Sequence, residues 1–74
     1  MNNAIMIHSE TTGTIGNAAS LYEACKAIVG KADLYVTVDG RPVAYWLGAV
    51  RPMFAATPAE RAQIAADAGI LVRG

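Results

Sequence analysis

The sequence has little of what most catalytic and metal sites are built from. It contains one histidine and one cysteine in 74 residues, so the common nitrogen and sulfur ligands of zinc cannot form a site from this chain alone. Its six acidic residues are scattered along the chain, and no pair of them is spaced as a two-carboxylate catalytic site. We therefore predict that the protein is not an enzyme, has no catalytic residue, and needs no metal or cofactor.

The single cysteine and the single histidine are each expected to have a structural role. Cys25 falls on the apolar face of a predicted helix with no neighbouring base, which is typical of a small core residue. It has no second cysteine to pair with, so the fold does not depend on an oxidising compartment and we predict a cytoplasmic location. His8 is expected at the exposed end of a strand, and it would act as a base only if Glu10 or Asp33 approached it.

Charge is also scarce. Six basic and six acidic residues give zero net charge, and charged residues are 16% of the chain against 54% hydrophobic residues. The chain therefore lacks the long-range positive field of a dedicated nucleic-acid binder, and some of its apolar surface should stay exposed or be covered by a partner. The N-terminal residues show no basic region and no long apolar run, so we expect them to form neither a signal peptide nor a membrane span. We expect residues 1–74 to form one domain.

The segment covering residues 33–48 predicts a β-hairpin. Two runs rich in β-branched and aromatic residues flank Asp39 and Gly40, and an Asp-Gly pair favours a two-residue type I′ turn. This turn predicts that Tyr35 and Trp46 share one face of the hairpin. The predicted pairs are Val38/Arg41, Val36/Val43 and Leu34/Tyr45 on one face, and Thr37/Pro42, Tyr35/Ala44 and Asp33/Trp46 on the other.

The residues before the hairpin predict a strand and a helix. Residues 4–8 alternate as a short strand, and residues 11–16 are polar and contain glycine, which is typical of a loop. Apolar residues then recur at helical spacing over residues 17–29, with Asn17 as the N-cap and Gly30 just beyond the end. A phosphate could lie at this helix start, but the loop lacks a full dinucleotide-binding motif and a P-loop lysine, so we interpret it as a connection.

The residues after the hairpin predict a second helix. Residues 49–56 are apolar but irregular, and the run Thr57-Pro58-Ala59-Glu60 then combines a capping box with proline at the first helical position. We predict a helix over residues 58–68 that ends at Gly69, followed by a short strand or a packed tail over residues 70–72. The predicted fold is a small single α+β domain in the order β-α-β-β-α, with the antiparallel hairpin packed by helices.

One helix face cannot cover both faces of so small a sheet, so the second helix or another molecule must cover the other face. Tryptophan, tyrosine, arginine and methionine are enriched at the centres of protein interfaces. An open strand edge can also pair with the same edge of a second copy, which would give a homodimer. The alternative for several of the candidate contact residues is that they complete the core. These partner-binding candidates are Tyr35, Arg41, Trp46, Arg51, Met53 and Phe54.

Three short motifs lie in the first two thirds of the chain. They are Leu21-Tyr-Glu-Ala-Cys with Val29-Gly30 in the predicted helix, Val36-Thr37 in the next strand, and Gly40-Arg41-Pro42-Val43-Ala44 after the turn. Together, over residues 4–47, they resemble the N-terminal half of the prevent-host-death antitoxin family. The resemblance implies a homodimer whose N-terminal domain binds operator DNA and whose C-terminal segment binds and neutralises a toxin.

Two functions of different classes follow from these observations. The first is a small protein-binding module that occludes a surface of a partner protein, for example a phage-type inhibitor of bacterial defence or host machinery, as anti-CRISPR proteins are. The second is a dimeric, antitoxin-like DNA-binding regulator, in which Lys26, Lys31 and Arg41 would contact phosphates. No membrane partner is expected in either case.

Overall fold

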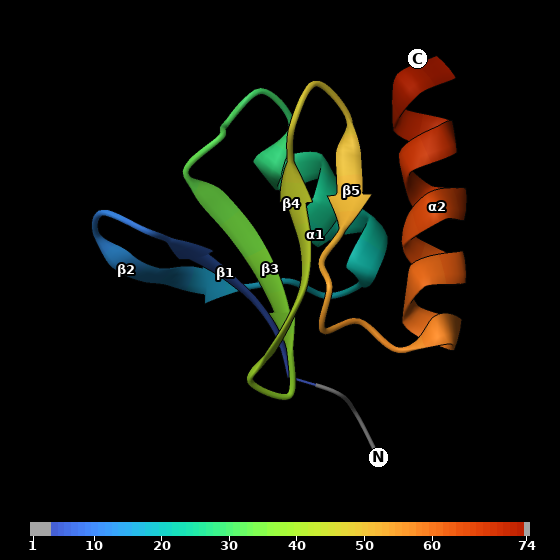
Figure 1. Cartoon of the computed structure of the whole chain (residues 1–74). Coiled ribbons are helices and arrows are strands. Elements are labelled where there is room, and N and C mark those ends of the chain that lie inside the picture. The colour runs from blue at the N-terminus through green and yellow to red at the C-terminus, as the bar shows by residue number, and fades with distance from the viewer. Residues whose placement is uncertain (1–3, 74) are drawn as a thin grey trace.

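The computed structural model describes residues 4–73 and shows five strands and two helices (Figure 1). The strands form one antiparallel sheet in the order β2-β1-β3-β4-β5. The α+β class is therefore confirmed, but the chain order is β-β-α-β-β-β-α, with two strands more than predicted. The elements are β1 (Ile5–Ser9), β2 (Gly13–Asn17), α1 (Leu21–Ile28), β3 (Leu34–Val38), β4 (Arg41–Trp46), β5 (Val50–Pro52) and α2 (Pro58–Arg73).

The segment that was expected to be a loop after β1 is strand β2. A turn stabilised by side chains connects them, because the Ser9 hydroxyl accepts hydrogen bonds from the amides of Thr11 and Thr12 at 3.1 and 3.2 Å. Gly13 then takes a φ of +89°, which glycine adopts without strain. The backbone of β2 pairs with β1 and does not lie at a helix start, so the possible phosphate site there is not formed.

Helix α1 begins three residues later than predicted. Its N-cap is Ser20, not Asn17, and the Ser20 hydroxyl accepts a hydrogen bond from the amide of Glu23 at 3.2 Å. Asn17 instead pairs with Met6 in the sheet. Gly30 follows the helix with a φ of +78°, in agreement with its predicted position beyond the end.

The Asp39-Gly40 turn forms as predicted, but the register beyond it is shifted. Both turn residues have positive φ values, 53° and 81°, and the pairs Val38/Arg41 and Thr37/Pro42 are those expected. A β-bulge at Val43 then places Ala44 opposite Val36. The pairs predicted farther from the turn are therefore wrong, because one extra residue exchanges the two faces of β4 from that position onward.

The chain after the hairpin contains a strand and a longer helix than predicted. Strand β5 pairs with β4 at the edge of the sheet, where Pro52 is tolerated. Helix α2 does not end at Gly69 and includes the residues expected to form a strand or tail. Its predicted capping box is confirmed, since the Thr57 amide donates to Glu60 Oε1 at 3.0 Å and the Glu60 amide donates to Thr57 Oγ1 at 3.2 Å.

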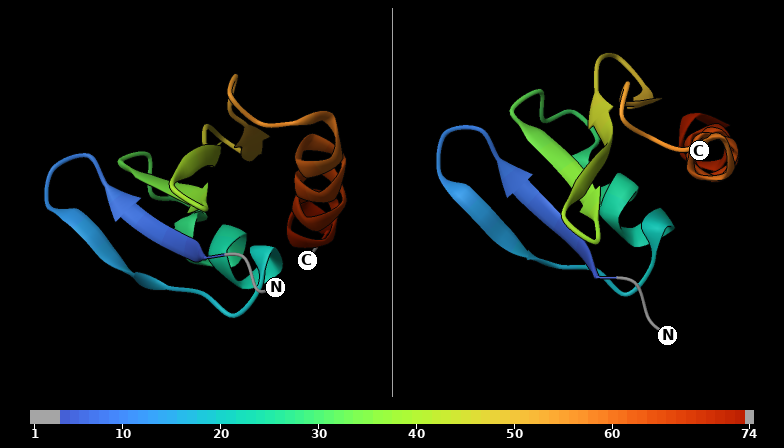
Figure 2. Two further views of the ribbon diagram at one scale, coloured as in Figure 1. Left: turned by 90° about the horizontal axis from the view of Figure 1, so that it is seen from below. Right: turned by 60° about the horizontal axis from the view of Figure 1, so that its bottom comes forward.

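Both helices pack on the same face of the sheet (Figure 2). Helix α1 contacts β1, β3 and β4, while α2 contacts α1, β5 and β4. The core lies between the helices and the sheet, and the opposite face of the sheet is uncovered by any described part of the chain. The buried apolar residues are Ile7, Ala24, Cys25, Ile28, Leu34, Val36, Val38, Val43, Ala44, Val50, Ala56, Ile64 and Ala68.

Cys25 is fully buried in this core, as predicted. Burial, with a smaller contribution from the Asp67 carboxylate, raises the pKa of its thiol from an ordinary 9.0 to about 12. The unfolded chain therefore ionises this thiol at a lower pH than the folded chain. Its stabilising effect is complete below pH 9 and is lost progressively as the pH rises toward 12.

We expect the free energy of unfolding to fall by about 1.4 kcal/mol between pH 7 and pH 10 because of Cys25. Urea unfolding at the two pH values measures this change. The control is Cys25→Ala, which removes only the thiol and should show a pH dependence weaker by that amount. An identical pH dependence in the variant would contradict the prediction.

Candidate binding face

The uncovered face of the sheet carries one row of side chains that crosses all five strands. Residues directly opposite each other in an antiparallel pair point to the same face. His8 pairs with Thr14 on β2 and with Tyr35 on β3. Tyr35 in turn pairs with Tyr45, and Tyr45 pairs with Arg51. We call the surface formed by this row and its neighbours Met6, Asn17 and Thr37 the open face.

The centre of the open face is held by hydrogen bonds and ring stacking. Thr37 Oγ1 lies 2.8 Å from Nε2 of His8, and Thr14 Oγ1 lies 3.0 Å from its Nδ1. The His8 ring stacks on Tyr35, with centroids 5.2 Å apart and an interplanar angle of 16°. Both ring nitrogens are thus partnered by hydroxyl groups, which can donate or accept. The aromatic surface is therefore fixed in position before any partner binds.

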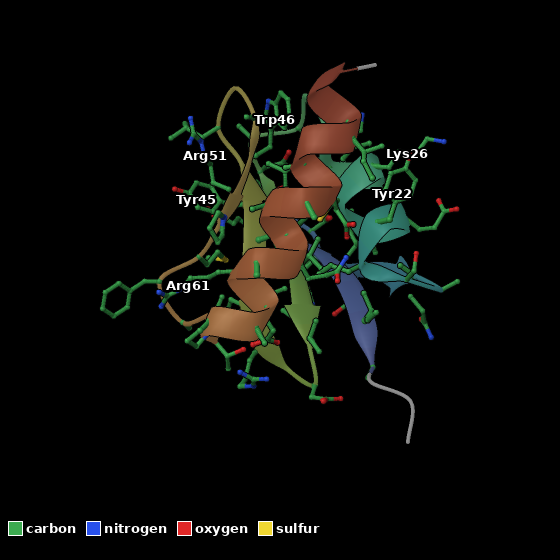
Figure 3. All side chains as sticks on the ribbon, turned by 90° about the vertical axis from the view of Figure 1, so that its right-hand side faces the viewer. Tyr22, Lys26, Tyr45, Trp46, Arg51 and Arg61 are labelled. Carbon is green, nitrogen blue, oxygen red and sulfur yellow. The ribbon has the colours of Figure 1, made fainter. Side chains whose placement is uncertain are left out.

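None of the residues that define the open face carries a carboxylate, and the nearest acidic residues along the β1–β3 ladder are Glu10 and Asp33, joined by a hydrogen bond from the Glu10 amide to the Asp33 carbonyl at 2.9 Å. All six acidic residues lie on the helices or in the connections: Glu10, Glu23, Asp33, Asp39, Glu60 and Asp67. Arg51 is the one lysine or arginine on this face, and it forms no ion pair with any described residue. Figure 3 shows Arg51 and Tyr45 pointing away from both helices. The face thus combines aromatic rings and hydroxyl groups with one uncompensated positive charge.

The structure divides the six predicted contact residues between different surfaces. Tyr35 and Arg51 lie on the open face, as a contact role requires. Trp46 does not, because the bulge turns it toward the helices, where it packs against the core (Figure 3). Arg41 also lies on the helix side and forms a two-point ion pair with Glu60, at 3.1 and 3.2 Å.

Met53 and Phe54 lie in the connection between β5 and α2. Phe54 does not pack against the core, since its side chain is 99% exposed. Its backbone is nevertheless held in place, because the Phe54 carbonyl accepts a hydrogen bond from Arg61 at 3.3 Å and the Met53 amide donates to Val43 at 3.0 Å. Phe54 is thus an exposed aromatic group on a braced connection, which is consistent with the predicted contact role.

Two ring-bearing residues of the open face, His8 and Tyr45, were missed as contact candidates. Tyr45 was predicted to pair with Leu34 on the face away from Tyr35, because nothing in the residues around Val43 indicates the bulge. His8 was predicted to be a surface residue at a strand end, but not a contact. The alternation of Ile5, Met6, Ile7 and His8 already places His8 on the other face of β1 from Ile7, which is buried, and Ile5, which is partly buried. Pairing with Tyr35 then gives His8 a central position.

The phosphate-contact candidates of the DNA-binding alternative do not lie on the open face. Lys26 is in the last turn of α1, and Lys31 is exposed in the connection that follows. Arg41 is neutralised by Glu60. These three cations therefore do not add positive charge to the row around Arg51.

Within residues 4–73 no group of three histidine, cysteine or acidic side chains could hold a metal ion. No helix in the same range is long and apolar enough to cross a membrane. Comparison with protein-family models, with curated proteins and with solved structures finds no match to this chain. The resemblance to the prevent-host-death antitoxin family accordingly stays a prediction.

Proposed function

We propose that the protein is a small, non-enzymatic binding module that occludes a surface of a cytoplasmic partner protein with its open face. The observation that carries the proposal is the acid-free row from Thr14 to Arg51, which no part of the described chain covers. Tyrosine and arginine are the residues that most often dominate protein interfaces. A phage-type inhibitor of bacterial defence or host machinery, such as an anti-CRISPR protein, would act in this way.

The distribution of charge favours a protein partner over nucleic acid. A protein that binds the phosphate backbone usually contacts it with several lysines or arginines, and its affinity falls steeply with salt. The open face presents one arginine, and the net charge of the chain is zero. One positive charge among hydroxyl-bearing rings instead suits a partner surface with a few acidic groups.

We expect Tyr45→Ala and Arg51→Glu each to weaken partner binding by about 30-fold, which corresponds to about 2 kcal/mol. Both residues lie on the exposed side of the sheet, so the variants should keep the circular-dichroism spectrum of the wild-type chain. The matched control is Lys31→Glu, which makes the same charge change in the exposed connection between α1 and β3. It should bind as the wild type does.

The experiment is affinity capture from nuclease-treated host lysate, followed by quantitative mass spectrometry. The four immobilised proteins are the wild type, Tyr45→Ala, Arg51→Glu and Lys31→Glu. The proposal requires a protein that the wild type and Lys31→Glu retain and that both open-face variants lose. Titration of that protein, once purified, then gives the dissociation constants. If no protein shows this pattern, the proposal is wrong. If Lys31→Glu instead abolishes salt-sensitive binding to duplex DNA from the upstream region, the DNA-binding alternative is favoured.

A further inference from the structure

The connection between β5 and α2 presents one aromatic side chain that the core does not use. The Ala56 amide donates a hydrogen bond to the Met53 carbonyl at 3.0 Å, which closes a β-turn with Phe54 and Ala55 as its central residues. Phe54 is 99% exposed, whereas Ala56, at the end of the same turn, is buried in the core. The phenyl ring therefore projects from a turn that is anchored at its far end.

Two further hydrogen bonds hold this turn in place. The Met53 amide donates to the Val43 carbonyl at 3.0 Å, which ties the start of the turn to β4. Nη2 of Arg61 donates to the Phe54 carbonyl at 3.3 Å, which ties the tip of the turn to the first turns of α2. A side chain on an ordered backbone loses less conformational entropy on binding than one on a mobile loop. Phe54 is thus positioned as a contact before any partner arrives.

Two arginines that form no ion pair with any residue in the range 4–73 flank the turn. Arg51 lies in β5, three positions before Phe54, and Arg61 bonds the Phe54 carbonyl. Figure 3 shows both arginine side chains on the same side of the molecule as Tyr45. Arg61 uses one of its five N–H donors for the turn, so its guanidinium can still bind a carboxylate.

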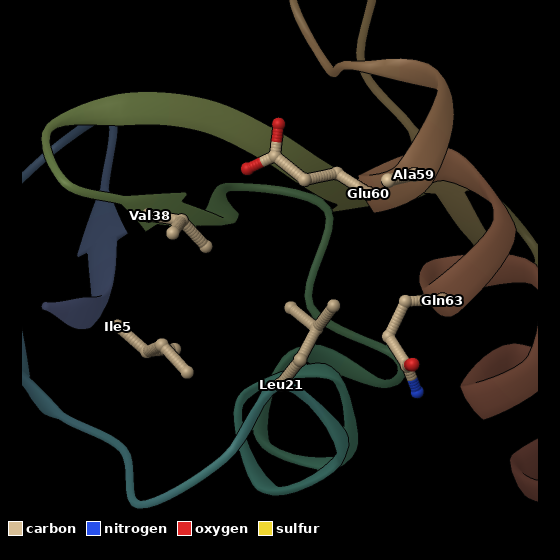
Figure 4. Close-up of a pocket in the computed structure, with 6 residues that line it drawn as sticks. All are labelled: Ile5, Leu21, Val38, Ala59, Glu60 and Gln63. Carbon is tan, nitrogen blue, oxygen red and sulfur yellow. The ribbon is translucent and has the colours of Figure 1, made fainter. Parts of the chain in front are cut away.

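The acidic residues nearest in the chain do not compensate these two charges. Residues 40–59 contain no aspartate or glutamate. The next residue, Glu60, lines a groove between the sheet and the two helices (Figure 4). Its carboxylate accepts two hydrogen bonds from Arg41 and is therefore already paired. The surface around Phe54 thus has two uncompensated positive charges, although the net charge of the chain is zero.

We propose that Phe54 inserts into an apolar pocket of the partner protein, and that carboxylates at the rim of this pocket pair with Arg51 and Arg61. The inference rests on the proposed function, because the protein that contacts the open face is the one that supplies the pocket. A fully exposed ring gains from burial in such a pocket, and aromatic and arginine side chains often dominate interfaces. The two free guanidinium groups select an acidic rim over a basic one.

Three forms of one synthetic cup test this chemistry: β-cyclodextrin, its carboxymethyl derivative and its amino derivative. All three offer an apolar cavity that admits a phenyl ring, and their rims are neutral, negative and positive. Each is titrated into the full chain at pH 7 and low salt, and the ring resonances of Phe54 are followed by NMR. We expect a dissociation constant of about 1–10 mM for the neutral cup. The carboxymethyl cup should bind at least about fivefold more tightly than the neutral cup, and the amino cup more weakly.

Variants separate the role of the ring from that of the charges. Phe54→Ala should weaken binding of all three cups by more than about tenfold. Arg51→Gln and Arg61→Gln should each bind the neutral cup as the wild type does and lose part of the preference for the carboxymethyl cup. Arg61→Lys keeps the charge and should keep the preference, which separates the charge from the hydrogen bond to the turn. Lys31→Gln is the matched control, and all four positions are exposed.

Equal binding of the three cups, wild-type affinity in Phe54→Ala, or an unchanged preference in both glutamine variants of the arginines would overturn the proposal. Oligothymidylate is titrated in the same way. If it binds more tightly than the carboxymethyl cup and loses this binding in Phe54→Ala, the ring stacks on nucleobases and the proposal of a protein pocket is wrong.

Affinity capture with Phe54→Ala as a further immobilised protein distinguishes this inference from the proposed function. A protein that both open-face variants lose should also be lost by Phe54→Ala, by at least about tenfold. If Phe54→Ala retains that protein, the open face binds the partner without Phe54, and only the present inference fails. If no protein depends on the open face, the proposed function fails whatever the cups show.

Discussion

Trp46→Ala should lower the free energy of unfolding by about 2–3 kcal/mol, as expected for truncating a large side chain that is partly buried against a core. The bulge at Val43 places Trp46 on the helix side, opposite Val50, where it packs against the core cluster. Without the bulge, Trp46 would lie on the open face and its removal would cost little. Urea unfolding of the variant measures this loss of stability and therefore tests whether β4 has the observed register.

The control for this prediction is Tyr45→Ala, at the neighbouring position on the opposite face. It should cost less than about 1 kcal/mol, as expected for a side chain on an uncovered sheet surface. A larger loss for Tyr45→Ala than for Trp46→Ala would contradict the observed register. It would instead support the register predicted from the Asp39-Gly40 turn, in which Trp46 shares a face with Tyr35 and Tyr45 lies on the other face.

Ile64→Ala should cost about 3 kcal/mol, within the range for a fully buried isoleucine. Ile64 is 0% exposed and is the one large apolar side chain that α2 buries completely among residues 58–71. The other buried positions of this part of the helix are Asp67 and Ala68, which contribute little apolar area. Leu71 of the same helix is only partly buried against the core, so Ile64 is the largest single contributor to the attachment of α2.

Hydrogen exchange of the α2 amides, together with urea unfolding, tests this dependence. In Ile64→Ala, protection should decrease most in α2, because the contacts that dock this helix are lost first. Ile70→Ala, at a position of the same helix that is 57% exposed, should change stability by less than about 0.5 kcal/mol. Equal effects of the two substitutions would show that Ile64 does not anchor the helix.

Features that depend on local chemistry could be predicted from the sequence. The turn at Asp39-Gly40 needs positive φ at two successive residues, and few pairs other than Asp-Gly meet that need. The Thr57–Glu60 capping box likewise depends on residues three apart in the chain. The burial of Cys25 followed from the apolar spacing of α1.

Features that depend on tertiary pairing could not be predicted. Strand β2 contains two glycines, which are poor strand formers, and it forms because β1 offers it a hydrogen-bonding edge. Gly69 is a weak helix former but carries no stop signal of its own, so α2 continues through it while packed on β5. The sequence also contains no signal for the bulge in β4, because Val43 and Ala44 are both apolar and either of them suits the core.

The candidate site could be predicted only in part, for the same reason. Tyr35 and Arg51 were named from residue type and lie on the open face. The row that joins them to His8 and Tyr45 exists because the bulge and the strand pairing bring four strands into one register. Residue type thus identifies candidate contacts, whereas the register decides which of them share a surface.

Strand β2 has a further consequence for how the molecule behaves at high concentration. It is an outer strand of the sheet, it contains no charged residue and no proline, and Ile15 on it is 58% exposed. Such an edge would normally act as a template for fibrillar growth. The irregularity in its pairing with β1, which leaves Ile15 without an opposite residue, interrupts the flat ladder that growth requires. We therefore expect this irregularity to disfavour polymerisation through the β2 edge, a role that lysine or proline has in many other sheets.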